Sequence, residues 1–143
     1  VPATAAEPQQ AEGYWEYITY VDDVKIAGCN QMLTTHEESI FTGTIDGYAT
    51  SQDSRIVIHC NGDVSYHGVL KFDEATVAGH TGGLVVLAQG RAPAPADHWT
   101  GTWVILSATG ELEGLHGGGS WSGPGAGGPF VWGGVDYEGS IHF

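Results

Sequence analysis

Three side chains in the sequence could supply acid–base or nucleophilic chemistry if they face a common cavity: Glu16, Cys60 and Tyr66. A carboxyl group in an apolar cavity is a usable general acid or base, a phenol is a hydrogen-bond donor, and a thiol is a nucleophile. We therefore predict these three as catalytic residues. The alternatives are that Glu16 faces solvent, that Tyr66 is a core or rim residue, and that Cys60 is an inert thiol or half of a disulfide with Cys29.

A second group of aromatic and aliphatic side chains is predicted to line a ligand-binding cavity, since alternate residues of a strand share one face. The alternative is that they are core or rim residues. The predicted ligand-binding residues are Tyr48, Leu70, Phe72, Trp99, Trp103, Tyr137 and Ile141.

Other motifs for chemistry are missing, and we predict neither a metal nor a cofactor. The seven histidines include no pair at the spacing that places two ligands on one face. His59 and His67 flank a predicted hairpin and could form a two-histidine site, with a pair of surface imidazoles as the alternative. The glycine-rich segment 117–128 lacks the Lys-Ser/Thr of a phosphate loop, and no serine lies in Gly-x-Ser-x-Gly.

The charge balance excludes some partners. The 143 residues include 17 acidic and four basic side chains, which gives a net charge of −13. A phosphate backbone repels such a surface, so nucleic acid is not an expected partner. No apolar run approaches the roughly 20 residues of a membrane-spanning helix, so no membrane span is predicted either.

The elements that must position these residues are predicted to be strands. Residues 1–12 are polar and rich in Ala and Pro, which predicts a flexible tail before a domain at 13–143. Aromatic, β-branched and alternating segments predict strands throughout that domain. The Asn61-Gly62-Asp63 turn predicts a hairpin within 54–73. The other predicted strands are 13–21, 37–52, 80–90, 98–110, 119–121 and 130–143, and 23–33 is ambiguous.

Eight or nine short-linked strands with 23 glycines and many aromatics predict an all-β fold with little helix. A sheet that closes into an antiparallel barrel has no exposed edges, and about eight strands enclose side chains or one small ligand. A two-sheet sandwich is the structural alternative.

Several segments carry a family resemblance: FTGTIDGYA (41–49), GHTGGLVVLAQG (79–90), WTGTWVILSATGELEGLHGGGSW (99–121) and YEGSIHF (137–143). The turn within 108–121 resembles one shared by allene oxide cyclases and dirigent proteins. In order and spacing the set most closely resembles a bacterial family of uncharacterised small barrels, domain of unknown function 3224. This resemblance implies an eight-stranded antiparallel barrel of allene-oxide-cyclase type.

The resemblance also implies a function class, because related barrels fold a reactive small molecule in an apolar cavity. The leading expectation is a cofactor-free isomerase or cyclase that acts on an apolar small molecule. One alternative is a non-catalytic barrel that binds a hydrophobic ligand or a protein partner. Another is a structural oligomer with a filled barrel, and a homodimer or homotrimer is compatible with each reading. The Ala/Pro-rich start slightly favours secretion over a cytoplasmic location.

Overall fold

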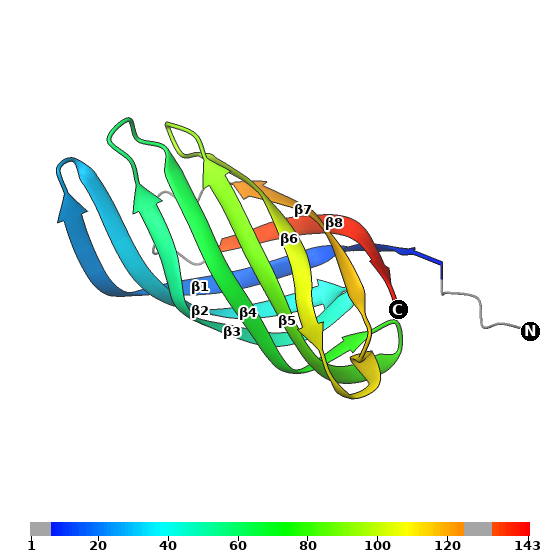
Figure 1. Cartoon of the computed structure of the whole chain (residues 1–143). Coiled ribbons are helices and arrows are strands. Elements are labelled where there is room, and N and C mark those ends of the chain that lie inside the picture. Colours follow the sequence, from blue (N-terminus) through cyan, green and yellow to red (C-terminus); the bar gives the residue numbers. More distant parts are fainter. Residues whose placement is uncertain (1–6, 125–132) are drawn as a thin grey trace, which may run out of the picture.

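Eight antiparallel strands follow one another around a closed barrel, and the last pairs with the first (Figure 1). The structure is a computed structural model, and it describes residues 7–124 and 133–143. The predicted all-β, eight-stranded antiparallel barrel is confirmed. The strands are β1 (Gln9–Ala27), β2 (Asn30–Gly43), β3 (Ile45–Ile58), β4 (Val64–Val77), β5 (His80–Ala92), β6 (His98–Ala108), β7 (His116–Pro124) and β8 (Gly133–His142).

The period of two along each strand separates the interior from the surface. On β1, Trp15 is buried, whereas its neighbour Tyr14 is 39% exposed. Trp15 lies opposite Phe41 of β2 and Val135 of β8, both of which are also buried. The alternation thus predicts which face of each strand contributes to the core.

Several of the predicted strand limits were wrong, and two of them change the barrel. Residues 37–52 do not form one strand, because the chain turns at Gly43 (φ +96°), and the Thr44 N–H donates to the Glu12 carbonyl at 2.9 Å. Residues 9–12, predicted as part of the tail, belong to β1 and pair with β8. Their pairing lengthens the β1–β8 contact that closes the barrel. Residues 1–6 of the predicted tail lie outside the described part.

The predicted hairpin at Asn61-Gly62-Asp63 is confirmed between β3 and β4. Gly62 has φ +92°, and the Asn61 side chain accepts a hydrogen bond from the Asp63 N–H at 3.0 Å. The Asp63 carboxylate accepts the Ala94 N–H at 2.7 Å and an Arg91 nitrogen at 3.2 Å. The Ala94 hydrogen bond is the main reason that the pKa of Asp63 lies below its usual value. These contacts join the β3–β4 and β5–β6 connections.

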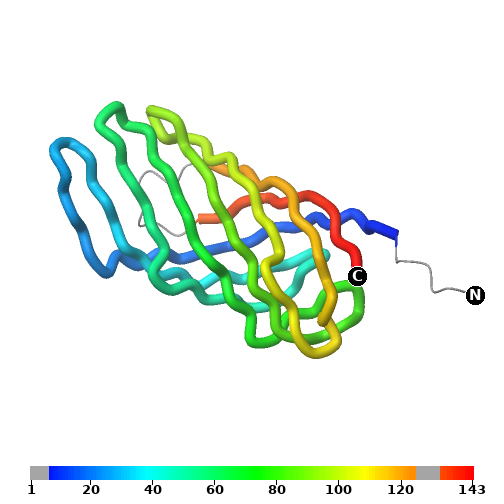
Figure 2. The backbone as a smooth tube through the Cα atoms, in the orientation of Figure 1, coloured from blue at the N-terminus to red at the C-terminus, as the bar shows by residue number. Residues whose placement is uncertain are grey.

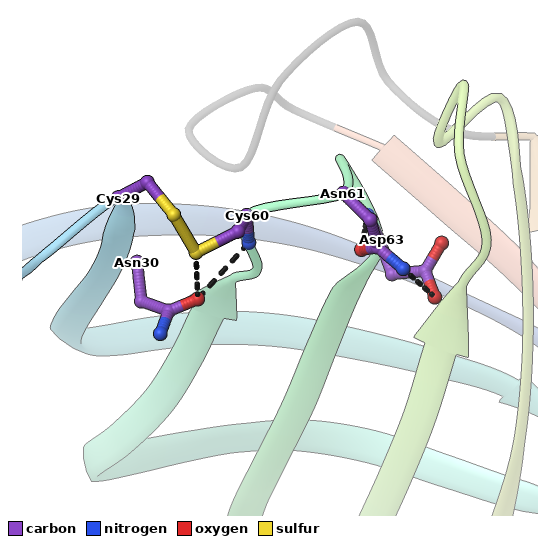
Figure 3. Close-up of a disulfide and its surroundings, with 5 residues drawn as sticks. All are labelled: Cys29, Asn30, Cys60, Asn61 and Asp63. Atoms are coloured by element: carbon purple, nitrogen blue, oxygen red, sulfur yellow. Dashed lines mark hydrogen bonds between the residues drawn. A yellow bond between two sulfur atoms is a disulfide. The ribbon is translucent and has the colours of Figure 1, made fainter.

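A disulfide links Cys29, in the turn between β1 and β2, to Cys60, in the connection between β3 and β4 (Figure 3). Beside it, the Asn30 side-chain oxygen accepts the Cys60 backbone N–H at 3.0 Å. The two hairpin ends lie on the same side of the barrel, as the tube trace shows (Figure 2). The bridge therefore links the two hairpin ends just beyond the last β2–β3 pair, Gln31 with Ile58.

The opposite end of the barrel is closed by side chains. The short connection between β6 and β7 carries the 3₁₀ helix η1 (Gly110–Leu112) and buries Leu112 and Leu115 against the core. Tyr137 crosses the interior from β8, donating to the Thr42 carbonyl at 2.8 Å and accepting the Ile45 N–H at 3.0 Å. Within the described ranges, no helix has the length and apolar character needed to cross a membrane.

Candidate site in the barrel lumen

Buried polar side chains gather on one interior wall of the barrel, made by β1, β2 and β3. Each is at most 6% exposed, although most polar side chains of a protein face solvent. These residues are Thr19, Thr35, Glu37, Ser39, Ser51 and Ser54.

Glu37 is the carboxylate on this wall and is 3% exposed. It accepts hydrogen bonds from the Thr35 hydroxyl at 3.3 Å and from the Ser51 hydroxyl. The Ser54 hydroxyl donates to Ser51 at 3.1 Å, so Ser54, Ser51 and Glu37 form a chain of hydrogen bonds. Among the described residues no Lys or Arg side chain pairs with this carboxylate, and all four basic side chains are exposed. Glu37 is thus a buried acid that lacks a cationic partner.

An irregularity in β3 brings Ser51 and Ser54 to the same side. The pairing with β4 shifts between Ser51 and Arg55, and Asp53 adopts a positive φ of 55°. A strand with an extra residue loses strict alternation at that point, and such bulges commonly redirect side chains beside functional sites. The segment 52–54, at which the predicted strand 37–52 ends and the predicted hairpin 54–73 begins, is therefore a bulge inside β3 that orients two hydroxyls toward Glu37.

Two tyrosines lie beside the buried carboxylate. Burial, followed by the negative charge of Glu37, raises the pKa of Tyr66 well above its ordinary value. Burial, followed by Tyr14 and Glu37, also raises the pKa of Tyr17. Both phenols therefore keep their protons over the physiological pH range and are available as hydrogen-bond donors.

Ser39 has an unusual position two residues after Glu37 on the same face of β2. Its side chain is 2% exposed, and its hydroxyl has no hydrogen-bond partner among residues 7–124 and 133–143. A buried polar atom without a partner costs about 1–3 kcal/mol, so most such atoms in proteins are satisfied. Because Ser39 lines a cavity, a molecule within that cavity could supply the missing partner.

The aromatic wall comes mainly from Trp15 of β1, Trp99 of β6 and Trp121 of β7. The ring of Trp121 lies 5.7 Å from that of Trp15 and 6.2 Å from that of Trp99, measured between centroids. The Trp121 N–H donates to the Thr102 carbonyl at 3.0 Å, which fixes the ring. Side chains at Gly90 and Gly101 would overlap this ring, so the two glycines make room for it. The tryptophans form a continuous apolar surface.

The polar and aromatic walls enclose a partly open cavity of about 50 Å³, counted as the space open to the centres of water molecules. One water needs about 10–15 Å³ on such a measure, so the cavity has room for a few waters or a ligand of about one ring. The lining residues are Trp15, Tyr17, Thr19, Glu37, Ser39, Ile56, Tyr66, Leu70, Trp99, Trp121 and Val135.

Three of the residues predicted from the sequence line this cavity: Tyr66, Leu70 and Trp99. Four others face inward but belong to the packed core beyond the cavity lining. The Trp103 N–H, for example, donates to the Glu138 carbonyl at 3.0 Å, and its ring packs edge-on against Tyr137. The four core residues are Phe72, Trp103, Tyr137 and Ile141.

The remaining predicted residues lie away from the lumen. Glu16 alternates with the buried Trp15 and pairs with Ile40, which is 56% exposed, so it lies on the outer face of β1. Tyr48 is 52% exposed, also opposite Ile40. Cys60 is oxidised in the disulfide, so it offers no free thiol. The catalytic roles predicted for Glu16 and Cys60 and the ligand contact predicted for Tyr48 do not agree with these positions.

The sequence analysis missed Glu37 and Ser39, although a signal for them was present. Thr35, Glu37 and Ser39 precede Phe41 at steps of two, so they share its inward face. Counting back from Phe41 in steps of two therefore predicts that these three polar side chains also face inward. The two histidines near the hairpin do not meet: His59 bonds Ser65, whereas His67 lies opposite Arg55 and Gln89. No cluster with the composition of a metal site occurs in the described part of the chain.

The fold and the site define a closed antiparallel β-barrel whose lumen holds a small cavity between a polar and an aromatic wall. The chain belongs to the family described as protein of unknown function (DUF3224), whose model matches residues 14–128. The predicted family is thereby confirmed. A crystal structure of a DUF3224 protein of unknown function from Shewanella oneidensis MR-1 is similar, with a TM-score of 0.74. It is 15% identical, over 96% of this chain and 98% of that one, a level that shows the fold alone. No curated protein matches the chain.

Proposed function

We propose that this barrel is an isomerase or cyclase that holds a small apolar molecule in its lumen and moves a proton on that molecule with Glu37. The observation that carries the proposal is the juxtaposition of a buried carboxylate, an unpartnered hydroxyl and an aromatic wall around one cavity. Perturbed and buried ionisable groups in a cavity are a common feature of catalytic sites. Glu37 takes the acid–base role that the sequence analysis assigned to Glu16.

The chemistry that these groups support is proton transfer next to a polarised oxygen. The Glu37 carboxylate takes a proton from a carbon beside a carbonyl group, and the C–H electron pair moves into a new C=C bond. Hydrogen bonds from Tyr66 and Ser39 to the carbonyl oxygen stabilise the negative charge that develops there. Glu37 then returns the proton at another carbon, so the product is an isomer and no atom is gained or lost.

The resemblance to allene oxide cyclases and dirigent proteins supports this reaction class, since those barrels also use an apolar interior to hold a reactive molecule. The cavity narrows the choice of substrate. A space for about one ring accommodates a compact molecule but not a long acyl chain, unless the chain leaves through the opening. The presence of the cavity also weighs against the alternative of a structural barrel filled by side chains.

The proposal is tested with cyclopent-3-enone, a one-ring ketone that becomes cyclopent-2-enone when a single proton moves. Its conversion is followed by absorbance and proton NMR with the wild type, Glu37→Gln and Glu38→Gln. Glu38 is the matched control because it neighbours Glu37 but is exposed. We expect the wild type and Glu38→Gln to catalyse the reaction and Glu37→Gln to lose about 100-fold or more of the rate.

Two results would contradict the enzyme proposal in different ways. In the first, the ketone binds, but it is converted at the same rate with the wild type and with Glu37→Gln. This result would leave the second candidate, a non-catalytic ligand-binding barrel, which the tryptophan wall favours. No detectable binding of any one-ring molecule, by ligand-observed NMR, would overturn both candidates.

A further inference from the structure

We infer that the lumen recognises an organic cation, a small protonated amine whose charge faces Glu37 and whose carbon skeleton lies against the tryptophans. This inference rests on the proposed use of the lumen as a binding site, and it narrows the apolar molecule of that proposal to one whose apolar carbon skeleton carries a protonated amine. It begins from the charge of Glu37. A buried carboxylate is costly unless a positive group or several hydrogen bonds compensate it.

The protein compensates Glu37 only in part. Thr35 and Ser51 donate to it and the Tyr66 phenol lies within hydrogen-bonding reach, yet an ionised carboxylate has about four acceptor positions. The unpartnered Ser39 oxygen, two residues along the same face, can also accept a hydrogen bond. An ammonium group carries three N–H donors and a positive charge. It could therefore satisfy Glu37 and Ser39 together, which a neutral hydrocarbon or ether cannot do.

The aromatic wall suits the same ligand. Trp is the best aromatic partner for a cation, and the attraction is stronger when the pair is shielded from water. Trp15, Trp99 and Trp121 line the cavity that Glu37 and Ser39 also line. The hydrogen bond from the Trp121 N–H to Thr102 holds in place one of the rings that line the cavity.

The charge of the whole protein acts in the same direction. A net charge of −13 raises the local concentration of small cations and lowers that of anions. The enclosed site and the outer surface thus both favour positively charged ligands.

The test compares three one-ring probes that differ in one group: benzylammonium, benzyl alcohol and toluene. Binding is measured by calorimetry and ligand-observed NMR at pH 7 in 0.5 M NaCl, which screens attachment to the acidic surface. We expect the wild type to bind benzylammonium at least 10-fold more tightly than benzyl alcohol. Glu37→Gln should abolish this preference, whereas Glu38→Gln should keep it.

Two variants of Trp99 check the contribution of the ring. Trp99→Phe should retain most of the preference for the cation, and Trp99→Leu should reduce it, with circular dichroism to confirm that each variant folds. Benzyl alcohol or toluene binding as tightly as benzylammonium would overturn the inference and leave the proposed function standing. A preference that survives Glu37→Gln would also overturn it. Failure of all three probes to bind would remove the proposed lumen function as well.

Discussion

The Tyr66 hydroxyl lies directly over Gly68, two residues farther along β4, so a methyl group on Gly68 would overlap the phenol. The same added methyl would lie 2.9 Å from the Ser54 hydroxyl oxygen. Gly68 therefore leaves the space in which Tyr66 reaches Ser54 and the buried carboxylate. This glycine is a structural requirement of the candidate site even though it has no side chain to line it.

Replacing Gly68 with alanine should destabilise the protein by about 1–3 kcal/mol, because it forces a side chain into an occupied interior. Urea unfolding measures the change. In a double-mutant cycle with Tyr66→Leu, the second substitution should cost less when Gly68→Ala is already present, since the two share one space. Strictly additive effects of the two substitutions would argue against the contact.

Ser39 and Ser54 form a matched pair of buried serines with opposite hydrogen-bonding status. Ser39→Ala removes an unpartnered hydroxyl and should raise the free energy of unfolding by about 1 kcal/mol. Ser54→Ala breaks the bond to Ser51 and should lower the free energy of unfolding by a similar amount. Thermal unfolding of the two variants tests this. Equal losses of stability would show that Ser39 has a partner in the folded protein.

The interior tyrosines predict how stability changes at alkaline pH. Burial raises the pKa values of Tyr17, Tyr66 and Tyr137 in the folded state above the value of about 10 for an unfolded tyrosine. Above pH 10 the folded state therefore holds more protons than the unfolded state, and its stability falls as the pH rises. Below pH 9 these groups should add no pH dependence.

The measurement is urea unfolding between pH 8 and 11.5. Tyr66→Phe should make the alkaline decline shallower, because it removes the tyrosine whose pKa is raised most clearly. The control is Tyr20→Phe, a change on the surface, where the side chain is 42% exposed. An identical decline in Tyr66→Phe and the wild type would contradict the assignment.

The Cys29–Cys60 bridge should contribute about 3–4 kcal/mol, since it closes a loop with a sequence separation of 31 residues. Dithiothreitol and the double variant Cys29→Ser/Cys60→Ser should lower the melting temperature alike. A melting temperature that reductant leaves unchanged would count against a structural role.

The strand pattern and the family motifs predicted the fold because their signals are local or repetitive. Asn61 and Gly62 specify a turn by themselves. The inward direction of Tyr66, Leu70 and Trp99 follows from the alternation of side chains along their strands. The limits at Gly43 and in the 52–54 segment were less predictable. Whether a glycine or a polar triplet makes a turn or a bulge depends on the neighbouring strand, which the local sequence does not specify.

The site was less predictable than the fold for the same reason. Glu16 and Glu37 both lie on strands rich in apolar residues. Glu16 is next to the inward-facing Trp15 and so faces outward, whereas Glu37 is an even number of residues from Phe41 and so faces inward. Tyr137 and Trp103 face inward as predicted, but their polar atoms bond to backbone carbonyls and their rings pack in the core. Inward direction alone does not distinguish a cavity wall from a filled layer.

The tryptophan wall has a practical consequence for finding the natural ligand. Indole emission responds to nearby charge, polarity and quenching groups, and three indoles border the cavity in which a ligand is proposed to bind. Any molecule that enters should change the intrinsic fluorescence of the unmodified protein. Compound collections can therefore be screened without a label, a known substrate or an assay for turnover.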